Sequence, residues 1–319
     1  MTNLTAPHFT DADKAREHLE VLRWPNGAVC PHCQSVNAQR LPAQRGRPTK
    51  AHPEGAVRDG IYQCRDCRKQ FSVTVGTVFE SSKVPLNKWL LATHLLCASK
   101  KGMSAHQLHR MLGITYKTAW FMFHRIREAM REGELATPFG SDGGPVEVDE
   151  TYIGRLKGQP VRKSGAHKMK VISLVERNTG RIMSFNFDQM ISTFVEPIVK
   201  ANIAKEARLI TDQARLYKML GKDFAKHETV NHSIREYARG DVFTNTVEGS
   251  FSIFKRGMKG VYQHCGEQHL HRYLAEFDFR YSNRAKLGVD DAARADRALK
   301  GIGGKRLTYR RSDEQYAQG

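Results

Sequence analysis

The chain has 319 residues, of which 51 are Lys or Arg and 33 are Asp or Glu, so its formal net charge is +18. Because 40% of the residues are hydrophobic, the length leaves room for two or three domains with packed cores, and a disordered protein is excluded. The excess of positive charge indicates a polyanionic partner, since Lys and Arg bind phosphates and release counterions. The alternative is a merely soluble basic protein.

Neither a membrane protein nor a secreted protein is expected. No stretch approaches the roughly 18 apolar residues of a membrane span, and residues 1–16 lack the apolar run of a signal peptide. The six cysteines are too few for a disulfide scaffold, and four of them form two C-x-x-C pairs. This pattern is typical of bound metal in a reducing compartment, so we expect a cytoplasmic protein.

Residues 1–86 are expected to form a small zinc-ribbon module with a short helical lead. Four thiolates in two pairs make a closed tetrahedral site, the arrangement of structural rather than catalytic zinc. The sequence therefore predicts one Zn²⁺ per chain, and the alternatives are a chance pairing or a redox pair. The expected ligands are Cys30, Cys33, Cys64 and Cys67.

A polar insert at residues 44–55 interrupts this module. It contains Arg45-Gly46-Arg47-Pro48, which resembles the core of an AT-hook, a short arm that lays arginines into a narrow A·T-rich minor groove. Arg45 and Arg47 are therefore candidate DNA-binding residues. A solvated basic loop accounts for the same four residues.

Residues 87–131 are expected to form an all-α helix-turn-helix region. Apolar residues recur there at helical spacing and are interrupted by Gly102 and Gly113, which indicates three helices. Thr115 is a suitable N-cap for the last helix. In a helix-turn-helix the N-terminal end of that helix enters the major groove, so Tyr116 and Lys117 would face DNA. A plain helical hairpin is the alternative. The basic residues that favour DNA are His109, Arg110, Lys117, His124, Arg125 and Arg127.

A Gly- and Pro-rich linker is expected at residues 132–145, followed by a domain at 146–285 and a basic tail at 286–319. Three strands followed by alternating helices and strands are typical of an α/β sheet domain. The expected elements are strands at 146–154, 169–176 and 181–187, a helix at 192–205, a strand at 208–211, a helix at 214–220, a short strand near 229 and a helix from 245.

Three acidic residues of this domain form a candidate catalytic set. Asp149 interrupts an alternating apolar strand, where a carboxylate is costly unless it is paired or holds a metal. Asp212 follows an apolar strand at its carboxyl end, where open α/β sheets place their sites. Glu248 lies near the start of the next predicted long helix, and 35 residues (213–247) separate it from Asp212.

This order and interval resemble the D, D(35)E motif of the ribonuclease H-like transposases and integrases. The resemblance implies two Mg²⁺ or Mn²⁺ ions shared by Asp149, Asp212 and Glu248, one activating the attacking hydroxyl and the other the leaving oxygen. It also implies that Lys255, seven residues after Glu248 and on the same helix face, contacts DNA phosphate near the cut end. The neighbouring Arg256 is a further candidate DNA-binding residue.

Motifs along nearly the whole chain are similar to one group of insertion-sequence DNA transposases of the DDE superfamily, which join a zinc ribbon and helix-turn-helix to a ribonuclease H-like catalytic domain. The resemblance implies a homo-oligomer that binds the terminal repeats of its element in the bacterial nucleoid, cleaves them and joins them to double-stranded target DNA. The motifs that carry it include Val148–Gly154, Asn245–Gly249, Phe254–Gly257 and the basic aromatic segment His269–Arg280.

Two alternatives stay open at this point. Some members of the group have an asparagine as the third catalytic residue, so Asn245 is an alternative to Glu248 as the third ligand. The alternative function is a zinc-ribbon DNA-binding regulator, or a catalytically inactive transposase relative, whose acidic residues are structural remnants.

Overall fold

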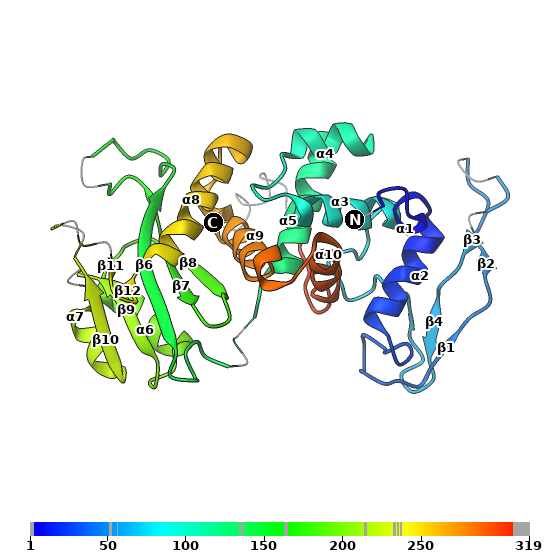
Figure 1. Cartoon of the computed structure of the whole chain (residues 1–319). Helices are drawn as coiled ribbons and strands as arrows, with labels where there is room; N and C mark the ends of the chain where they lie inside the picture. Colours follow the sequence, from blue (N-terminus) through cyan, green and yellow to red (C-terminus); the bar gives the residue numbers. More distant parts are fainter. Residues whose placement is uncertain are drawn as a thin grey trace, which may run out of the picture. The chain divides into compact units, whose positions relative to one another are not determined.

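The computed structural model describes residues 3–308, except 51, 52, 56, 134, 136, 163, 164, 214, 215, 232, 233, 235 and 237. The chain folds into two compact units (Figure 1). The first unit comprises residues 1–98, 105–130 and 291–319, and the second comprises residues 99–104 and 131–290. The first unit therefore contains segments from both ends of the sequence.

The described part of the first unit contains six helices. Asp11 begins the second of them, because its side chain accepts a hydrogen bond from the backbone N–H of Lys14 at 2.8 Å. The helices are α1 (Pro7–Thr10), α2 (Ala12–Arg23), α3 (Leu86–Ala98), α4 (Ala105–Leu112), α5 (Tyr116–Met130) and α10 (Asp291–Lys300).

The helix α10 replaces part of the tail that the sequence predicts at 286–319. It packs against α2, α3 and α5, and the guanidinium of Arg294 donates a hydrogen bond to the carbonyl of Cys97 at 2.8 Å. The segment contains a short apolar stripe at helical spacing, which is hard to recognise in the sequence because most of its neighbours are charged. Residues 309–319 of the predicted tail lie outside the described residues. The buried apolar side chains of α10 are Ala295, Ala298 and Leu299.

Two small antiparallel sheets lie between α2 and α3 in the chain. Trp24, at the end of α2, meets Tyr62 and Phe71 edge-on, with ring centroids 5.2 and 5.8 Å apart. This aromatic cluster packs the larger sheet onto α2. The larger sheet has the order β1 (Ala38–Arg40), β4 (Tyr62–Cys64) and β5 (Gln70–Phe71), and the smaller pairs β2 (Gln44–Arg45) with β3 (Val57–Arg58).

A five-stranded mixed sheet forms the centre of the second unit, which confirms the expected α/β domain. Its order is β10-β9-β6-β7-β8. The consecutive strands β6, β7 and β8 are antiparallel, whereas β9 runs parallel to β6 and β10 runs parallel to β9. The strands are β6 (Pro145–Ile153), β7 (Met169–Glu176), β8 (Ile182–Phe187), β9 (Arg208–Asp212) and β10 (Lys226–Val230), and a hairpin pairs β11 (Ala238–Arg239) with β12 (Val242–Phe243).

Helices cover both faces of this sheet. The helices α6 (Ser192–Asn202) and α7 (Tyr217–Leu220) pack on one face through Val195, Val199 and Tyr217. The helices α8 (Asn245–Gly257) and α9 (Leu270–Ser282) pack on the other face (Figure 1). Among the described helices, none combines the length and the apolarity needed to span a lipid bilayer. Short helical turns occur at Gly221–Asp223, Met258–Tyr262, Glu267–His269 and Ala285–Leu287.

Part of the linker predicted at 132–145 belongs to the second unit. Phe139 is completely buried in its core, and the N–H of Phe139 donates to the carbonyl of Asn202 at 2.8 Å. The N–H of Gly140 donates to the carboxylate of Glu176 at 2.7 Å. The glycines and prolines of this segment therefore shape a turn that leads into β6 instead of a free connection.

Glu147 of β6 fixes the start of α8. Its side chain is fully buried, and Oε2 accepts hydrogen bonds from the backbone N–H groups of Thr246 and Val247, each at 3.0 Å. Its other carboxylate oxygen pairs with the guanidinium of Arg177. A carboxylate from the sheet thus satisfies two of the N–H groups that the first turn of a helix leaves open, and it complements the helix dipole.

We expect Glu147→Ala to lower the free energy of unfolding of the second unit by about 3–5 kcal/mol, because Arg177 and two buried N–H groups lose their acceptor. Urea denaturation measures the change. Glu196→Ala is the matched control, since Glu196 pairs with Lys200 at 3.8 Å on the surface of α6, where such a pair contributes about 0–1 kcal/mol. Equal unfolding midpoints for the two variants would contradict the anchoring role.

Candidate functional site

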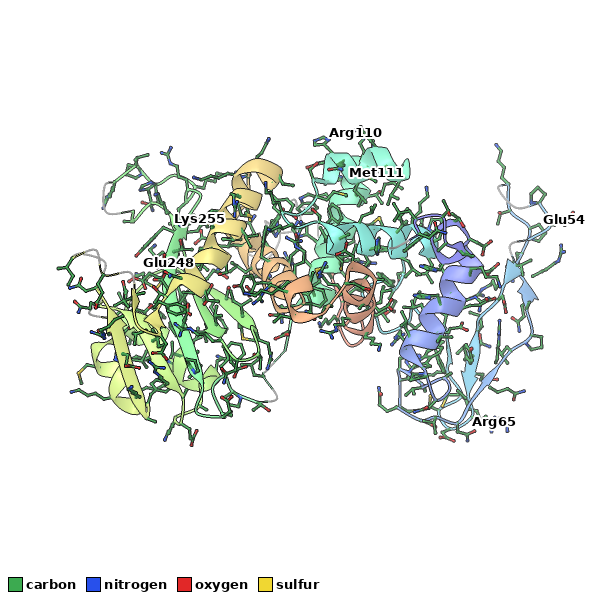
Figure 2. The ribbon with its side chains drawn as sticks, viewed as in Figure 1. Glu54, Arg65, Arg110, Met111, Glu248 and Lys255 are labelled. Atoms are coloured by element: carbon green, nitrogen blue, oxygen red, sulfur yellow. The ribbon has the colours of Figure 1, made fainter. Side chains whose placement is uncertain are left out.

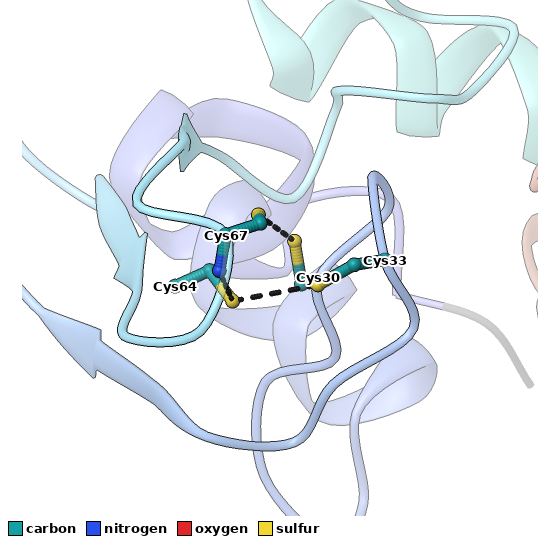
Figure 3. Close-up of side chains that lie close together, drawn as sticks. All are labelled: Cys30, Cys33, Cys64 and Cys67. Carbon is teal, nitrogen blue, oxygen red and sulfur yellow. Dashed lines mark hydrogen bonds between the residues drawn. The ribbon is translucent and has the colours of Figure 1, made fainter.

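Four cysteine sulfurs form the expected zinc centre of the first unit (Figure 3). Their Sγ atoms all lie within 4.8 Å of one another, with 3.7 Å between Cys30 and Cys67 and 3.6 Å between Cys33 and Cys64. A tetrahedral zinc with Zn–S bonds of about 2.3 Å requires sulfurs about 3.8 Å apart. The four thiols therefore fit a closed, structural zinc site.

Two turns of the same form hold the cysteine pairs. In each, the residue after the second cysteine is left-handed, Gln34 with φ 63° and Arg68 with φ 62°. The N–H of the first cysteine then donates to a carbonyl five residues on, that of Ser35 at 2.9 Å or Lys69 at 3.0 Å. A non-glycine residue adopts this conformation at some cost, so its repetition indicates two equivalent halves of one site.

Asp149 and Asp212 lie side by side on one face of the central sheet. The strands β6 and β9 pair in parallel with Glu147 opposite Ile210, so the same register continued by two positions puts Asp149 beside Asp212. Side chains alternate along a strand, and both aspartates share the face on which Glu147 meets α8. Asp212 ends β9, at the carboxyl edge that the sequence predicts.

The helix α8 brings Glu248 and Lys255 to the same place. They lie two turns apart along the helix (Figure 2). The hydroxyl of Thr244 donates to the carboxylate of Glu248 at 2.9 Å, which restricts its rotamer. Both residues line a cavity of about 700 Å³ that Asp149 also lines. The charged residues of this carboxylate cavity are Asp149, Glu150, Glu248, Lys255, Arg256 and Lys259.

Neighbouring carboxylates and burial both act on Asp149 in the carboxylate cavity. Burial raises the pKa of Asp149 to about 8, and the charges of Glu150, Asp212 and Glu248 act in the same direction. Burial lowers the pKa of Lys255, against the favourable charge of Asp149. A cation placed among these carboxylates would relieve their repulsion, so the residues present fit a divalent metal ion.

The structure separates the two candidates for the third ligand. Asn245 is the exposed first residue of α8 and is absent from the described lining of the carboxylate cavity. Glu248, one turn further along, lines the cavity and contributes to the raised pKa of Asp149. Glu248 is thus the candidate that lines the cavity, and its role as the third ligand stays a prediction.

Three charged residues near the cavity are not among the site residues predicted from the sequence. Glu150 accepts a hydrogen bond from the hydroxyl of the buried Tyr217 at 2.6 Å. Glu147 lies two residues before Asp149 on the same strand, so both side chains are on one face of the sheet. Two acidic residues at this spacing on an apolar strand are the sequence signal that could have identified Glu147. Lys259, in the turn that follows α8, lines the same cavity as Lys255.

The start of α5 presents the residues expected to face DNA. Thr115 caps the helix, because its hydroxyl accepts a hydrogen bond from the backbone N–H of Thr118 at 3.2 Å. Tyr116 and Lys117 are exposed. The ring of Tyr116 stacks on His106 of α4, with centroids 4.2 Å apart.

Three basic residues that favour DNA in the sequence are buried instead. His124, Arg125 and Arg127 are between 1% and 8% exposed. Arg125 donates hydrogen bonds to the carbonyls of Glu80 at 3.0 Å and Leu307 at 3.1 Å. The helices α3 and α10 both pack against α5. In this region Arg110, labelled on α4 in Figure 2, remains exposed together with Lys117.

The insert at 44–55 is bounded by the hairpin of β2 and β3. A Cβ on Gly55, whose φ is 82°, would lie 2.1 Å from the carbonyl oxygen of Gly46, so the turn requires glycine. Arg45 pairs with Glu54 at 3.0 Å, and Arg47 is exposed. Because a surface ion pair contributes only about 0–1 kcal/mol, Arg45 can exchange Glu54 for a phosphate.

We expect one zinc ion per purified chain and, in Cys64→Ser, loss of that zinc together with unfolding of the small sheets, because metal binding supplies the folding energy of such modules. The three tryptophans, Trp24, Trp89 and Trp120, all lie in the first unit, so their fluorescence reports on that unit alone. Cys265→Ser, outside the cluster, is the control. Elemental analysis that finds no zinc in the unaltered chain would contradict the prediction.

Two transposase families match this chain. Residues 143–282 match the ISXO2-like transposase domain, and residues 10–70 match the transposase zinc-ribbon domain. A relative from Halobacterium salinarum, named as an uncharacterized protein in transposable element ISH50, is 28% identical over 288 residues, which are 85% of this chain and 91% of the relative. The first match contains the carboxylate cavity and the second contains the four cysteines. These matches together support an insertion-sequence transposase, with a zinc-ribbon domain ahead of its transposase domain.

Proposed function

We propose that this transposase cleaves the ends of its element and joins the freed 3′-hydroxyl groups to target DNA by in-line attack at phosphorus. The observation that carries the proposal is the gathering of Asp149, Asp212 and Glu248 on one face of the sheet, where their charges disfavour ionisation of Asp149. Such a cluster is costly to a fold unless it binds cations.

Carboxylate oxygens are the ligands that Mg²⁺ and Mn²⁺ prefer. When bound, two such ions activate the attacking hydroxyl and stabilise the leaving oxygen. Among the described residues, only the four cysteines bring three or more ligand atoms within 4.8 Å, so the three carboxylates span a wider site. In enzymes that use two such ions, the ions lie about 3.5–4 Å apart.

The basic residues of α8 would hold the DNA at this site. Lys255 is half-buried beside Asp149, so its ammonium group can bind a phosphate oxygen next to the reacting bond. Arg256 is exposed at the same cavity, and its Nε donates to the carbonyl of Ser252 at 3.1 Å. This hydrogen bond orients the guanidinium for a second phosphate.

The order and directions of the strands support assignment of the second unit to the ribonuclease H-like fold. Three antiparallel strands come first in the chain, and two further strands then add in parallel on the other side of β6. This topology puts Asp149 on the central strand and Asp212 at the end of its neighbour, so the two carboxylates need no loop to position them.

The first unit would bind the terminal repeats of the element. The helices α4 and α5, with the turn at 113–115, are proposed as a helix-turn-helix that places Tyr116 and Lys117 in the major groove. The arginines of the insert, Arg45 and Arg47, would reach the flanking minor groove. Because an element has two ends, we expect at least two copies of the chain to act together on DNA.

Glu248→Gln is expected to abolish metal-dependent cleavage as completely as Asp149→Asn, because an amide is a weaker ligand for a hard dication than a carboxylate. Asn245→Ala should stay within about tenfold of the unaltered rate, or about 1.4 kcal/mol in activation free energy. The assay is cleavage and strand transfer of element-end duplexes, with a gel shift to show that end binding persists. Activity that survived Glu248→Gln but vanished in Asn245→Ala would reverse the two roles.

Lys117→Ala should weaken binding to the terminal repeats and reduce the preference over random duplex by about 1–3 kcal/mol, as expected for loss of a base contact. Arg45→Ala should affect only A·T-rich flanking DNA. Fluorescence anisotropy at physiological salt measures both, with Lys14→Ala, an exposed helical lysine of the same unit, as control. Equal affinity of the unaltered chain for repeats and random DNA would refute specific binding.

A further inference from the structure

A second, larger hollow adjoins the carboxylate cavity and is named here the basic groove. Its volume is about 990 Å³. Its walls are residues 152–158 at the end of β6 and after it, Lys168 and Met169 at the start of β7, and residues that follow α8 as far as position 268. Lys255 and Lys259 line both hollows, so the basic groove begins where the carboxylate cavity ends.

Cations outnumber carboxylates among the described residues that line the basic groove. Among the described residues that line it, Glu267 is the sole carboxylate, and none of the five cations forms an ion pair with a described carboxylate. By contrast, Arg208 on β9 of the same unit is paired with Glu228. Like charges gathered in one hollow repel each other, and a polyanion relieves that repulsion. The five cations are Arg155, Lys157, Lys168, Lys255 and Lys259.

The backbone turn after α8 holds Lys259 at the junction of the two hollows. Residues Met258–Tyr262 form a π-helical turn, a form that often marks functional sites. Met258 is buried, and the hydroxyl of Tyr262 donates to the buried carboxylate of Glu276, so both ends of the turn are anchored. The next residue, Gln263, has φ 59°, an uncommon value for a non-glycine residue.

We propose that the basic groove binds the sugar–phosphate backbone of the DNA strand that flanks the reacting phosphate, through Lys157, Lys168 and Lys259. The inference rests on the proposed function of the carboxylate cavity. If one phosphate of a DNA strand lies beside Asp149, the strand enters the groove directly as it passes Lys255. A chain of phosphates can contact all five cations, whereas a small anion would contact one or two. These contacts are independent of base sequence.

The double variant Lys157→Ala/Lys168→Ala tests the groove by equilibrium binding. All chains carry Asp149→Asn, and the probe is a duplex of one element end with its flanking DNA. No Mg²⁺ or Mn²⁺ is added, so no cleavage intervenes, and no chelator is used, so the zinc site keeps its metal. Each lost phosphate contact makes the slope of log K against log salt concentration less steep by about 0.9, so the double variant should lose about 1.8. The exposed Lys157→Ala alone should lose about 0.9.

Lys205→Ala/Lys222→Ala is the matched control, because it removes the same charge from exposed positions outside both hollows and should leave the slope unchanged. Methylphosphonates placed one at a time in the flanking strand locate the contacts: they should weaken binding of the parent chain but not further weaken binding of the groove variant.

Two results separate the groove from the proposed function. A salt slope of the groove variant equal to that of the control, in a protein whose unaltered form cleaves DNA, would overturn the groove and leave the catalytic assignment intact. A reduced slope in a protein that shows no metal-dependent cleavage would keep the groove as a DNA site and reject the catalytic assignment.

Discussion

The buried carboxylate of Glu147 is the interaction on which the geometry of the second unit depends. It extends from β6 on the same face as Asp149 and accepts two N–H groups at the start of α8. The same contact therefore sets where Glu248, in the first turn of that helix, meets the sheet. Arg177 compensates the buried charge of Glu147 and also lies 3.7 Å from the ring centroid of Phe243, which explains how the charge is tolerated.

Because α8 is anchored in this way, the carboxylate of Glu248 lies close to those of Asp149 and Asp212. The pKa of Asp149 is raised from 3.8 to about 8, mainly by burial and then by neighbouring carboxylates. Because the folded pKa lies above the unfolded one, the cost of this group to the folded state grows as the pH rises from about 4 to about 8 and is constant above. Contacts away from the cavity, such as that between Glu147 and Arg177, hold the arrangement in place against that cost.

The sequence predicts what is encoded locally and misses what depends on distant partners. Spacing is enough to predict the four cysteines, the five strands and the acidic positions, because period and motif are local properties. Glu147 escapes prediction because its acceptor role needs N–H groups about a hundred positions away, at Thr246 and Val247. The prediction that Arg125 favours DNA binding also fails because of a distant partner. Its guanidinium is buried and donates to the carbonyl of Leu307, near the other end of the chain.

Net charge alone is therefore a poor guide to where this protein meets DNA. Arg127 adds to the charge of +18 but is fully buried over the ring of Phe123, with 5.6 Å between guanidinium and centroid. A cation binds phosphate at little cost only when its head group is accessible and its charge is not already compensated. Lys157 and Lys168 form no ion pair with a described carboxylate, so their charges are not compensated in this way. Both line the basic groove, where their head groups are accessible. The uncompensated cations, and not their total number, therefore mark the surface on which a DNA strand can lie.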